Sequence, residues 1–185
     1  LITERPGRLR VFANGRLERA PLGGVPKVYA RGQGGLLDIC LHPQFAQNRT
    51  LYLSYSAEGS GGAATTVARA ELGDGALRGL RTIFEALPRA SGSLHFGSRI
   101  AFDRAGLMYV TTGERYQRDR AQDLNDLGGK VARLRDDGSV PADNPFVGRP
   151  NVRPEIFTWG HRNPQGLAMH PDTGRTWETE HGPRG

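Results

Sequence analysis

Two polar stretches of this 185-residue chain carry the side chains best suited to chemistry. The first, Leu94–Ile100, holds His95 on a glycine-containing loop directly before an apolar segment. The second, Trp159–Leu167, holds Arg162 and Asn163 in the same setting. Functional side chains are commonly carried on loops that a rigid scaffold positions. The shared arrangement therefore predicts that both stretches contribute to one pocket.

His95 has the chemistry of a general base, because an ordinary histidine titrates near about pH 6.5 and is largely neutral at pH 7. Glu114 follows the next predicted strand and could return toward His95, where a carboxylate would favour the protonated imidazole and strengthen the base. Two other interpretations stay open. His95 could satisfy a backbone carbonyl of its own loop, and Glu114 could be a solvated turn carboxylate paired with Arg115, which composition alone favours.

Arg162 offers a planar, positively charged guanidinium group, and Asn163 offers an amide donor beside it. This pairing suits an oxyanion or a quinone oxygen that gains negative charge. The alternative role of the two side chains is to close their own loop by bonding neighbouring carbonyls. Pro164 stiffens the loop and the glycines around it permit close approach of a ligand, so the functional role is favoured.

Two further segments supply weaker chemical signals. Gln33 stands on a glycine-rich loop, where a neutral amide could bind a sugar hydroxyl or serve only as a turn residue. The run His181-Gly182-Pro183 contains a Gly-Pro pair. Such a pair presents backbone carbonyl oxygens, which suit a hard cation such as calcium.

The elements that must position these side chains are short strands. Three strand-turn-strand units, at 39–55, 100–112 and 167–179, resemble one another, and further strands are expected at 65–72 and 129–134. The units recur about every sixty residues, more than the roughly forty to forty-five of a compact propeller blade, so long loops are expected between strands. With 26 Gly and 12 Pro between short alternating runs, the class is all-β. We predict a radially repeated β-propeller.

The length of the chain bears on its domain organisation. Six blades of this size would need about 350 residues, whereas this chain accounts for about three. Residues 1–185 are therefore expected to be part of a single β-propeller domain whose N-terminal and C-terminal portions are missing.

Composition argues against several other classes. The chain has a formal net charge of +6, but its arginines are scattered and form no basic stripe, so nucleic-acid binding is not expected. A diffuse positive field instead favours a small anionic substrate or cofactor. No apolar run approaches the roughly twenty residues of a membrane span, and Cys40 has no second cysteine with which to form a disulfide. Phosphate-loop, HExxH, CxxC and GxSxG signatures are also lacking.

A set of short motifs carries a resemblance to a known family. They are, in order, Gly34-Gly35-Leu36-Leu37-Asp38, His42-Pro43-Gln44-Phe45, His95-Phe96-Gly97-Ser98-Arg99, Thr112-Gly113-Glu114, Gly128-Gly129-Lys130, Asp143-Asn144-Pro145-Phe146, Gly160-His161-Arg162-Asn163-Pro164-Gln165-Gly166 and Glu180-His181-Gly182-Pro183. In these motifs, which cover essentially the whole chain, the sequence resembles the soluble aldose sugar dehydrogenases of the glucose/sorbosone dehydrogenase family, which depend on pyrroloquinoline quinone (PQQ).

The resemblance implies a six-bladed β-propeller with PQQ and a calcium ion in a cleft on one face, where the C1 hydroxyl of an aldose sugar is oxidised to a lactone. His95 matches the family's general base, Glu114 the acid that supports it, and Gln33 a contact to the substrate. In the family scheme the base takes the hydroxyl proton while hydride passes to the quinone. An external electron acceptor and a periplasmic or secreted location are implied as well.

The resemblance also implies the cofactor side of the site. Arg162 and Asn163 match groups on the quinone carbonyl, with Arg162 stabilising its charge, and His181 lies among the cofactor-binding residues. Gly182 and Pro183 match carbonyl ligands of the cofactor calcium, which would polarise the same quinone.

One departure and two alternatives accompany this hypothesis. The family often carries a polar residue at the position of Leu94, so substrate contacts at that edge are expected to differ. A non-catalytic extracellular propeller that only binds a partner is the main alternative, and it would be expected to lose the base or the Arg-Asn pair. A metal-dependent lactonase would need a carboxylate-rich calcium site, which these residues do not offer.

Overall fold

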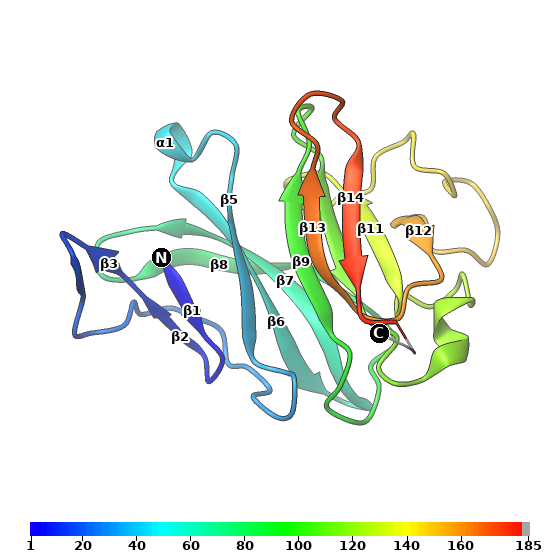
Figure 1. The fold of residues 1–185 in the computed structure, drawn as a ribbon, viewed down its shortest axis with the longest axis horizontal. Coiled ribbons are helices and arrows are strands. Elements are labelled where there is room, and N and C mark those ends of the chain that lie inside the picture. The colour runs from blue at the N-terminus through cyan, green and yellow to red at the C-terminus, as the bar shows by residue number, and fades with distance from the viewer. Residues whose placement is uncertain (183–185) are drawn as a thin grey trace.

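The computed structural model describes residues 1–182, and these residues form mainly β-strands (Figure 1). The first four-stranded antiparallel sheet has the order β5-β6-β7-β8, with β5 at Leu36–Leu41, β6 at Thr50–Gly59, β7 at Gly62–Leu72 and β8 at Leu77–Glu85. The central strand β6 is buried from Thr50 to Ser56. Its side chains alternate between two cores, because Tyr52 packs into one and Leu51 and Leu53 into the other.

The second four-stranded antiparallel sheet has the order β12-β11-β10-β9. Its strands are β9 at Gly97–Phe102, β10 at Met108–Thr112, β11 at Lys130–Leu134 and β12 at Ile156–Trp159. The long connection between β10 and β11 contains the short 3-10 helix η1 at Arg118–Ala121. In both sheets, consecutive strands pair with their neighbours along the chain, as expected for an antiparallel meander.

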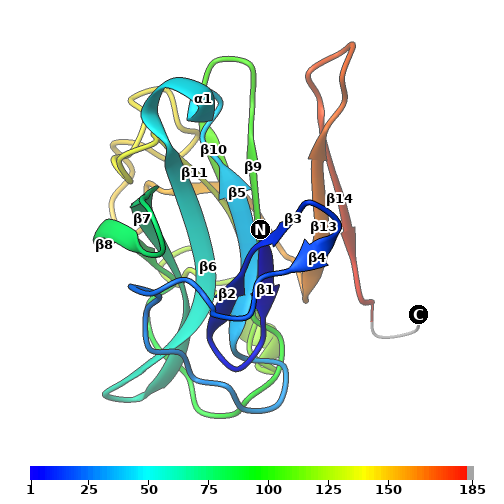
Figure 2. The same cartoon turned by 90° about the vertical axis from the view of Figure 1, so that its left-hand side faces the viewer.

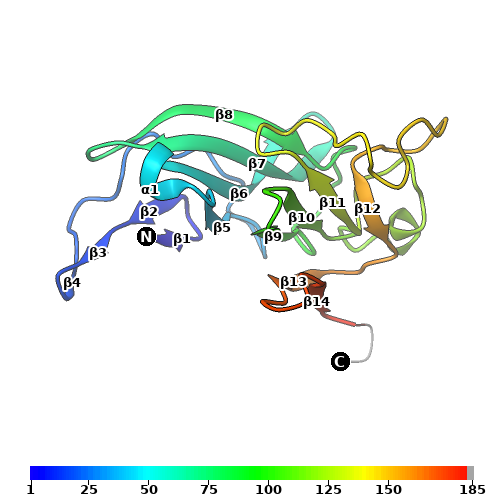
Figure 3. The ribbon, with the colours of Figure 1, turned by 90° about the horizontal axis from the view of Figure 1, so that it is seen from above.

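Three hairpins and one helical turn complete the fold. They are β1 at Ile2–Glu4 with β2 at Arg8–Arg10, β3 at Phe12–Ala13 with β4 at Arg16–Leu17, β13 at Pro164–Met169 with β14 at Thr176–Glu180, and α1 at Phe45–Asn48. Figure 2 shows the β13–β14 hairpin on one side of the molecule and the first sheet on the other. The strand β9 contacts both β5 and β13. These three strands therefore lie side by side along one edge of the molecule (Figure 3).

The hydrophobic core is divided between two interfaces. One cluster joins the facing sides of the two sheets and includes Tyr52 and Val67 from the first sheet with Met108 and Val110 from the second. The other cluster lies between the first sheet and the N-terminal hairpins and is centred on the fully buried Leu9. Burial of this apolar surface fixes the two sheets against each other and so positions the loops at their ends.

The structure confirms the all-β class and all three predicted strand-turn-strand units, which correspond to β5–β6, β9–β10 and β13–β14. The strands predicted at 65–72 and 129–134 are β7 and β11. Residues 1–182 form no closed ring of sheets, so the six-bladed propeller stays a prediction. No helix among the described residues has the length and apolar character needed to cross a membrane.

Cys40 on β5 is a free thiol that is partly buried. Burial, and to a smaller extent the charge of Asp38, raises the pKa of this thiol to about 11. The thiolate is therefore scarce at neutral pH, so this thiol is a poor nucleophile.

Candidate functional site

His95 and Glu114 form a buried pair at the centre of the site. The strand pairing of β9 with β10 places Gly97 opposite Thr112, so the loop entering β9 meets the loop leaving β10. His95 Nδ1 lies 2.5 Å from Glu114 Oε1, and the two residues are 5% and 1% exposed. An ionised Glu114 can only accept, so a neutral imidazole in this contact carries its proton on Nδ1 and its free lone pair on Nε2.

The backbone around this pair requires glycine at two positions. A Cβ on Gly113 would collide with the carbonyl oxygen of His95, and one on Gly97 would lie 2.8 Å from the carbonyl carbon of Thr112. Gly97 also takes φ +63°, a conformation that L side chains rarely adopt. These glycines allow the two loops to approach closely enough for the His95–Glu114 contact.

Gln33 and Asn163 hold the His95 loop from its two sides. Gln33 Oε1 accepts the backbone N–H of His95 at 2.7 Å. Asn163, which is 2% exposed, accepts the N–H of Gly97 at 3.1 Å and the side-chain amide of Gln165 at 3.0 Å through Oδ1. Both residues were predicted as ligand contacts. The structure brings them to the site and shows, in addition, that their amide oxygens fix the base.

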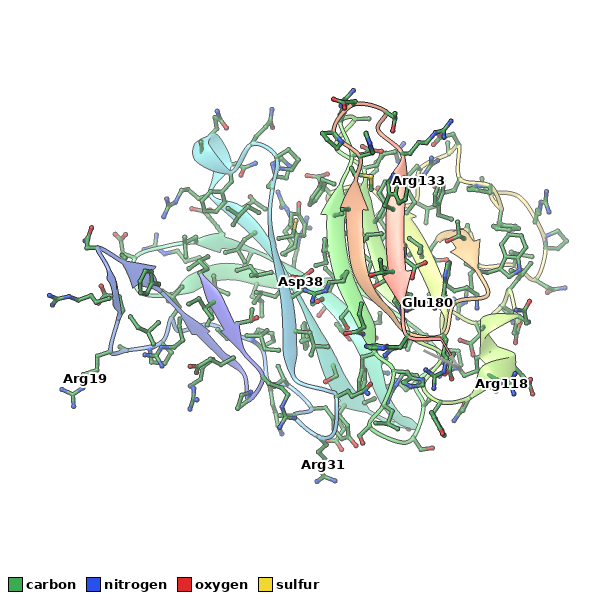
Figure 4. All side chains as sticks on the ribbon, viewed as in Figure 1. Arg19, Arg31, Asp38, Arg118, Arg133 and Glu180 are labelled. Carbon is green, nitrogen blue, oxygen red and sulfur yellow. The ribbon has the colours of Figure 1, made fainter. Side chains whose placement is uncertain are left out.

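Arg162 links three parts of the site. Its carbonyl oxygen accepts the N–H of Glu114 at 2.9 Å, and its guanidinium donates to the carbonyls of His181 at 3.0 Å and Gly182 at 3.2 Å. Its backbone N–H donates to Glu180 Oε2 at 2.6 Å. Figure 4 shows Glu180 at the end of β14. Sequence reasoning missed Glu180, although it immediately precedes the predicted His181-Gly182-Pro183 run.

Arg115 is a second residue that sequence reasoning missed. The expectation that Glu114 pairs with Arg115 in a solvated turn is wrong, because Glu114 is buried against His95. The Arg115 guanidinium lies 3.6 Å over the Phe96 ring, and burial lowers its pKa to about 10, so it stays charged at neutral pH. It donates hydrogen bonds to the backbone carbonyls of Leu94, Ala63 and Gly92.

His161, next to Arg162, faces the carboxylate of Glu178. His161 Nδ1 lies 3.2 Å from Glu178 Oε2, and His161 Nε2 lies 2.8 Å from the Thr158 hydroxyl. Burial lowers the pKa of His161, and this shift favours the neutral form of its ring. Burial also raises the pKa of Glu178, with a smaller contribution from Glu180 in the same direction. His161 was not predicted to take part in chemistry.

Two cavities open beside the His95–Glu114 pair. The smaller, of about 260 Å³, is lined in part by Gln33, Asn163 and His181. The larger, of about 780 Å³, is lined in part by Glu114 and Arg162. Its volume lies within the roughly 300–1,000 Å³ typical of ligand sites. The structure thus divides the predicted residues between two cavities, and His95 lines neither of them, so the single shared pocket stays a prediction.

The site contains groups that suit an anionic quinone and groups that could bind a metal ion. The larger cavity combines sufficient volume with the Arg162 guanidinium, which suits carboxylates and quinone oxygens. The carbonyl oxygen of Gly182, predicted to bind calcium, accepts a hydrogen bond from Arg162 and keeps a second lone pair. The other predicted carbonyl ligand, Pro183, lies outside the described residues. The described part of the site thus contains one of the two predicted calcium ligands, and a separate group, His161, Glu178 and Glu180, has ligand atoms that all lie within 4.8 Å of one another.

Comparison with known proteins identifies relatives along the whole chain. The family model described as Glucose / Sorbosone dehydrogenase matches residues 1–185. Aldose sugar dehydrogenase YliI of Escherichia coli (strain K12) is 48% identical over 188 residues, a match that covers 100% of this chain and 51% of that protein. This chain spans about half the length of the curated relatives it matches.

Solved structures are similar as well. The soluble aldose sugar dehydrogenase from Escherichia coli in its apo-form superposes with a TM-score of 0.95 at 49% identity, covering 99% of this chain and 54% of that one. The PQQ-bound form of aldose sugar dehydrogenase from Streptomyces coelicolor superposes with a TM-score of 0.78 at 32% identity, covering 96% of this chain and 52% of that one.

Proposed function

The chain belongs to the glucose/sorbosone dehydrogenase family, and on this basis we propose that it supplies the catalytic base of a PQQ-dependent dehydrogenase that oxidises aldose sugars at C1. The buried His95–Glu114 pair, with 2.5 Å between Nδ1 and Oε1, is the observation that carries the proposal. A binding domain without catalysis would be expected to lose the base, whereas this chain keeps it paired with a buried carboxylate, an arrangement that is common where a base is tuned for catalysis.

His95 acts as the base through Nε2. This atom makes no hydrogen bond to residues 1–182, so its lone pair can accept the proton of the C1 hydroxyl group. As the proton arrives, the imidazole becomes positively charged, and the Glu114 carboxylate stabilises that charge from the Nδ1 side. Gln33 and Asn163 hold the loop on both sides of His95, so the ring does not have to reorient during the reaction.

Arg162 supplies fixed positive charge at the cavity wall. Its guanidinium is held by the carbonyls of His181 and Gly182, which orient it before a ligand arrives. We assign Arg162, with Asn163 and His181, to the cofactor side of the site, and Gln33 to the substrate side. PQQ, when bound, would supply the acceptor for the hydride that leaves C1 of the sugar, so the products are a lactone and the reduced cofactor.

The remaining parts of the proposal concern the whole protein. The PQQ-bound state of the Streptomyces coelicolor relative supports the cofactor assignment. Calcium held by the carbonyls of Gly182 and Pro183, an external electron acceptor and a periplasmic or secreted location are proposed from the family. The two blade-like four-stranded sheets support a six-bladed β-propeller as the complete fold.

The test is dye-linked oxidation of aldoses by the full-length protein after addition of PQQ and calcium. We expect turnover that requires PQQ and is abolished in His95→Ala, and a calcium-chelated sample tests the metal separately. Titration of PQQ into wild type and His95→Ala shows whether the variant still binds the cofactor. A wild-type protein that neither binds PQQ nor oxidises any aldose would refute the proposal and favour the binding-domain alternative.

A further inference from the structure

Tyr116, two residues after Glu114, has an unusual backbone conformation. Its φ is +61°, and Arg115 before it has φ +60°. A bulky L residue rarely adopts this left-handed region, because its Cβ comes too close to backbone atoms. Such strain persists only where the surrounding structure over-determines it, and it concentrates at functional sites. The conformation of Tyr116 therefore calls for a reason beyond local preference.

The contacts on both sides of Tyr116 hold its backbone in place. The N–H of Glu114 donates to the Arg162 carbonyl at 2.9 Å, and the N–H of Gln117 donates to the Glu114 carbonyl at 3.0 Å. The guanidinium of Arg115 is anchored on three backbone carbonyls. The side chain of Tyr116, by contrast, is 67% exposed and makes no hydrogen bond to the described part of the chain. The fold fixes this backbone without burying the ring.

The Tyr116 ring lies beside the catalytic base. Its centroid is 5.2 Å from that of the His95 ring, and the two planes are inclined at 63°. Tyr116 also lines the cavity of about 780 Å³, together with Glu114 and Arg162. An exposed aromatic ring at the wall of a polar cavity suits a ligand with an apolar face and a polar rim. A pyranose has this character, because its C–H bonds form apolar faces while its hydroxyl groups point outward.

We propose that Tyr116 is a specificity-determining residue. Its ring packs against the C–H face of a pyranose aldose, and this contact places the C1 hydroxyl group at His95 Nε2. This role rests on the aldose oxidation proposed above. The ring selects cyclic sugars over open-chain alcohols, since only a cyclic sugar presents a flat apolar face. The left-handed backbone is the cost of pointing the ring at the cavity next to the base.

Two variants of the full-length protein, reconstituted with PQQ and calcium, test this role. Tyr116→Gly is expected to raise the KM for glucose about two- to tenfold, because one aromatic contact contributes on this order. Its kcat and its affinity for PQQ should change little. Its melting temperature should stay equal or rise, because glycine adopts φ > 0 without strain. Tyr116→Phe keeps the ring and should retain most of the affinity for glucose.

Phe12→Ala is a matched control, because Phe12 is a similarly exposed aromatic residue on the distant strand β3, and it should leave the KM unchanged. Calorimetric titration of each protein with glucose gives a readout of sugar binding without turnover. If the wild-type protein is active and Tyr116→Gly has the wild-type KM for glucose, the role of Tyr116 is overturned and the proposed reaction stands. If Tyr116→Gly binds PQQ more weakly and its KM for glucose is unchanged, the proposed role is also overturned, because the ring then contacts the cofactor. A wild-type protein without PQQ-dependent turnover removes both proposals.

Discussion

Replacing Glu114 by Gln removes one charge from the buried pair and leaves its size almost unchanged. In the wild type, the carboxylate faces the positive charge that forms on His95 during proton transfer, and neither residue is more than 5% exposed. At an effective dielectric constant of about 20, unit charges about 4 Å apart attract by about 4 kcal/mol. At about 1.4 kcal/mol for each tenfold change in rate, Glu114→Gln should lower kcat about a thousandfold.

The amide also changes which proton His95 carries. A glutamine can turn its NH₂ group toward Nδ1, and the proton then moves to Nε2, where it blocks the base. This effect acts in the same direction as the lost charge, and together they fall within the roughly 10²- to 10⁴-fold that general bases contribute. The KM for glucose and the affinity for PQQ should change far less than kcat, because the Glu114 carboxylate opposes a positive charge that forms on His95 only during proton transfer.

Steady-state kinetics of the reconstituted full-length protein measures this effect. Glu58→Gln, at the exposed end of β6, is the matched control and should keep wild-type kcat. Thermal unfolding checks that Glu114→Gln is folded, since a buried amide without partners costs about 1–3 kcal/mol. A folded Glu114→Gln variant with kcat within fivefold of wild type would show that the carboxylate does not support the base.

Two further predictions concern the loops around the pair. Arg115→Met leaves the carbonyls of Leu94 and Gly92 without a donor, at about 1–3 kcal/mol for each group and not additively, while the carbonyl of Ala63 keeps the N–H of Ala90. We expect a lower melting temperature and a larger fall in kcat than rise in KM, whereas an unchanged melting temperature would contradict the role of this anchor. Lys130 is fully buried and donates to three carbonyls, and burial lowers its pKa from 10.5 to about 8. Between these pH values the unfolded chain binds more protons at this site, so the contribution of Lys130 to stability is full above about pH 10.5 and is lost as the pH falls to about 8. Chemical denaturation at pH 8 and pH 10 should show a smaller rise in stability with pH for Lys130→Met than for wild type, and parallel curves would refute the assignment.

Local sequence patterns determined much of the fold. Runs of alternating apolar residues, each ended by turn residues, predict strands close to their observed positions. These strands are β5, β6, β7, β9, β10 and β11. This succeeds because side-chain alternation and turn chemistry act over a few residues and are visible in any short window. The same local view identified His95 and Arg162 as candidates, since each follows or precedes a glycine-containing turn next to an apolar strand.

The partners of these residues were decided only by the tertiary structure. Glu114 has Arg115 beside it in sequence, yet its carboxylate bonds to His95, 19 residues away, because strand pairing brings the two loops together. The bond from Glu180 to the Arg162 backbone depends in the same way on the β13–β14 pairing. Sequence specifies which groups are available, but burial and strand register select the contacts, because a carboxylate turns to whichever donor the packed fold places within reach.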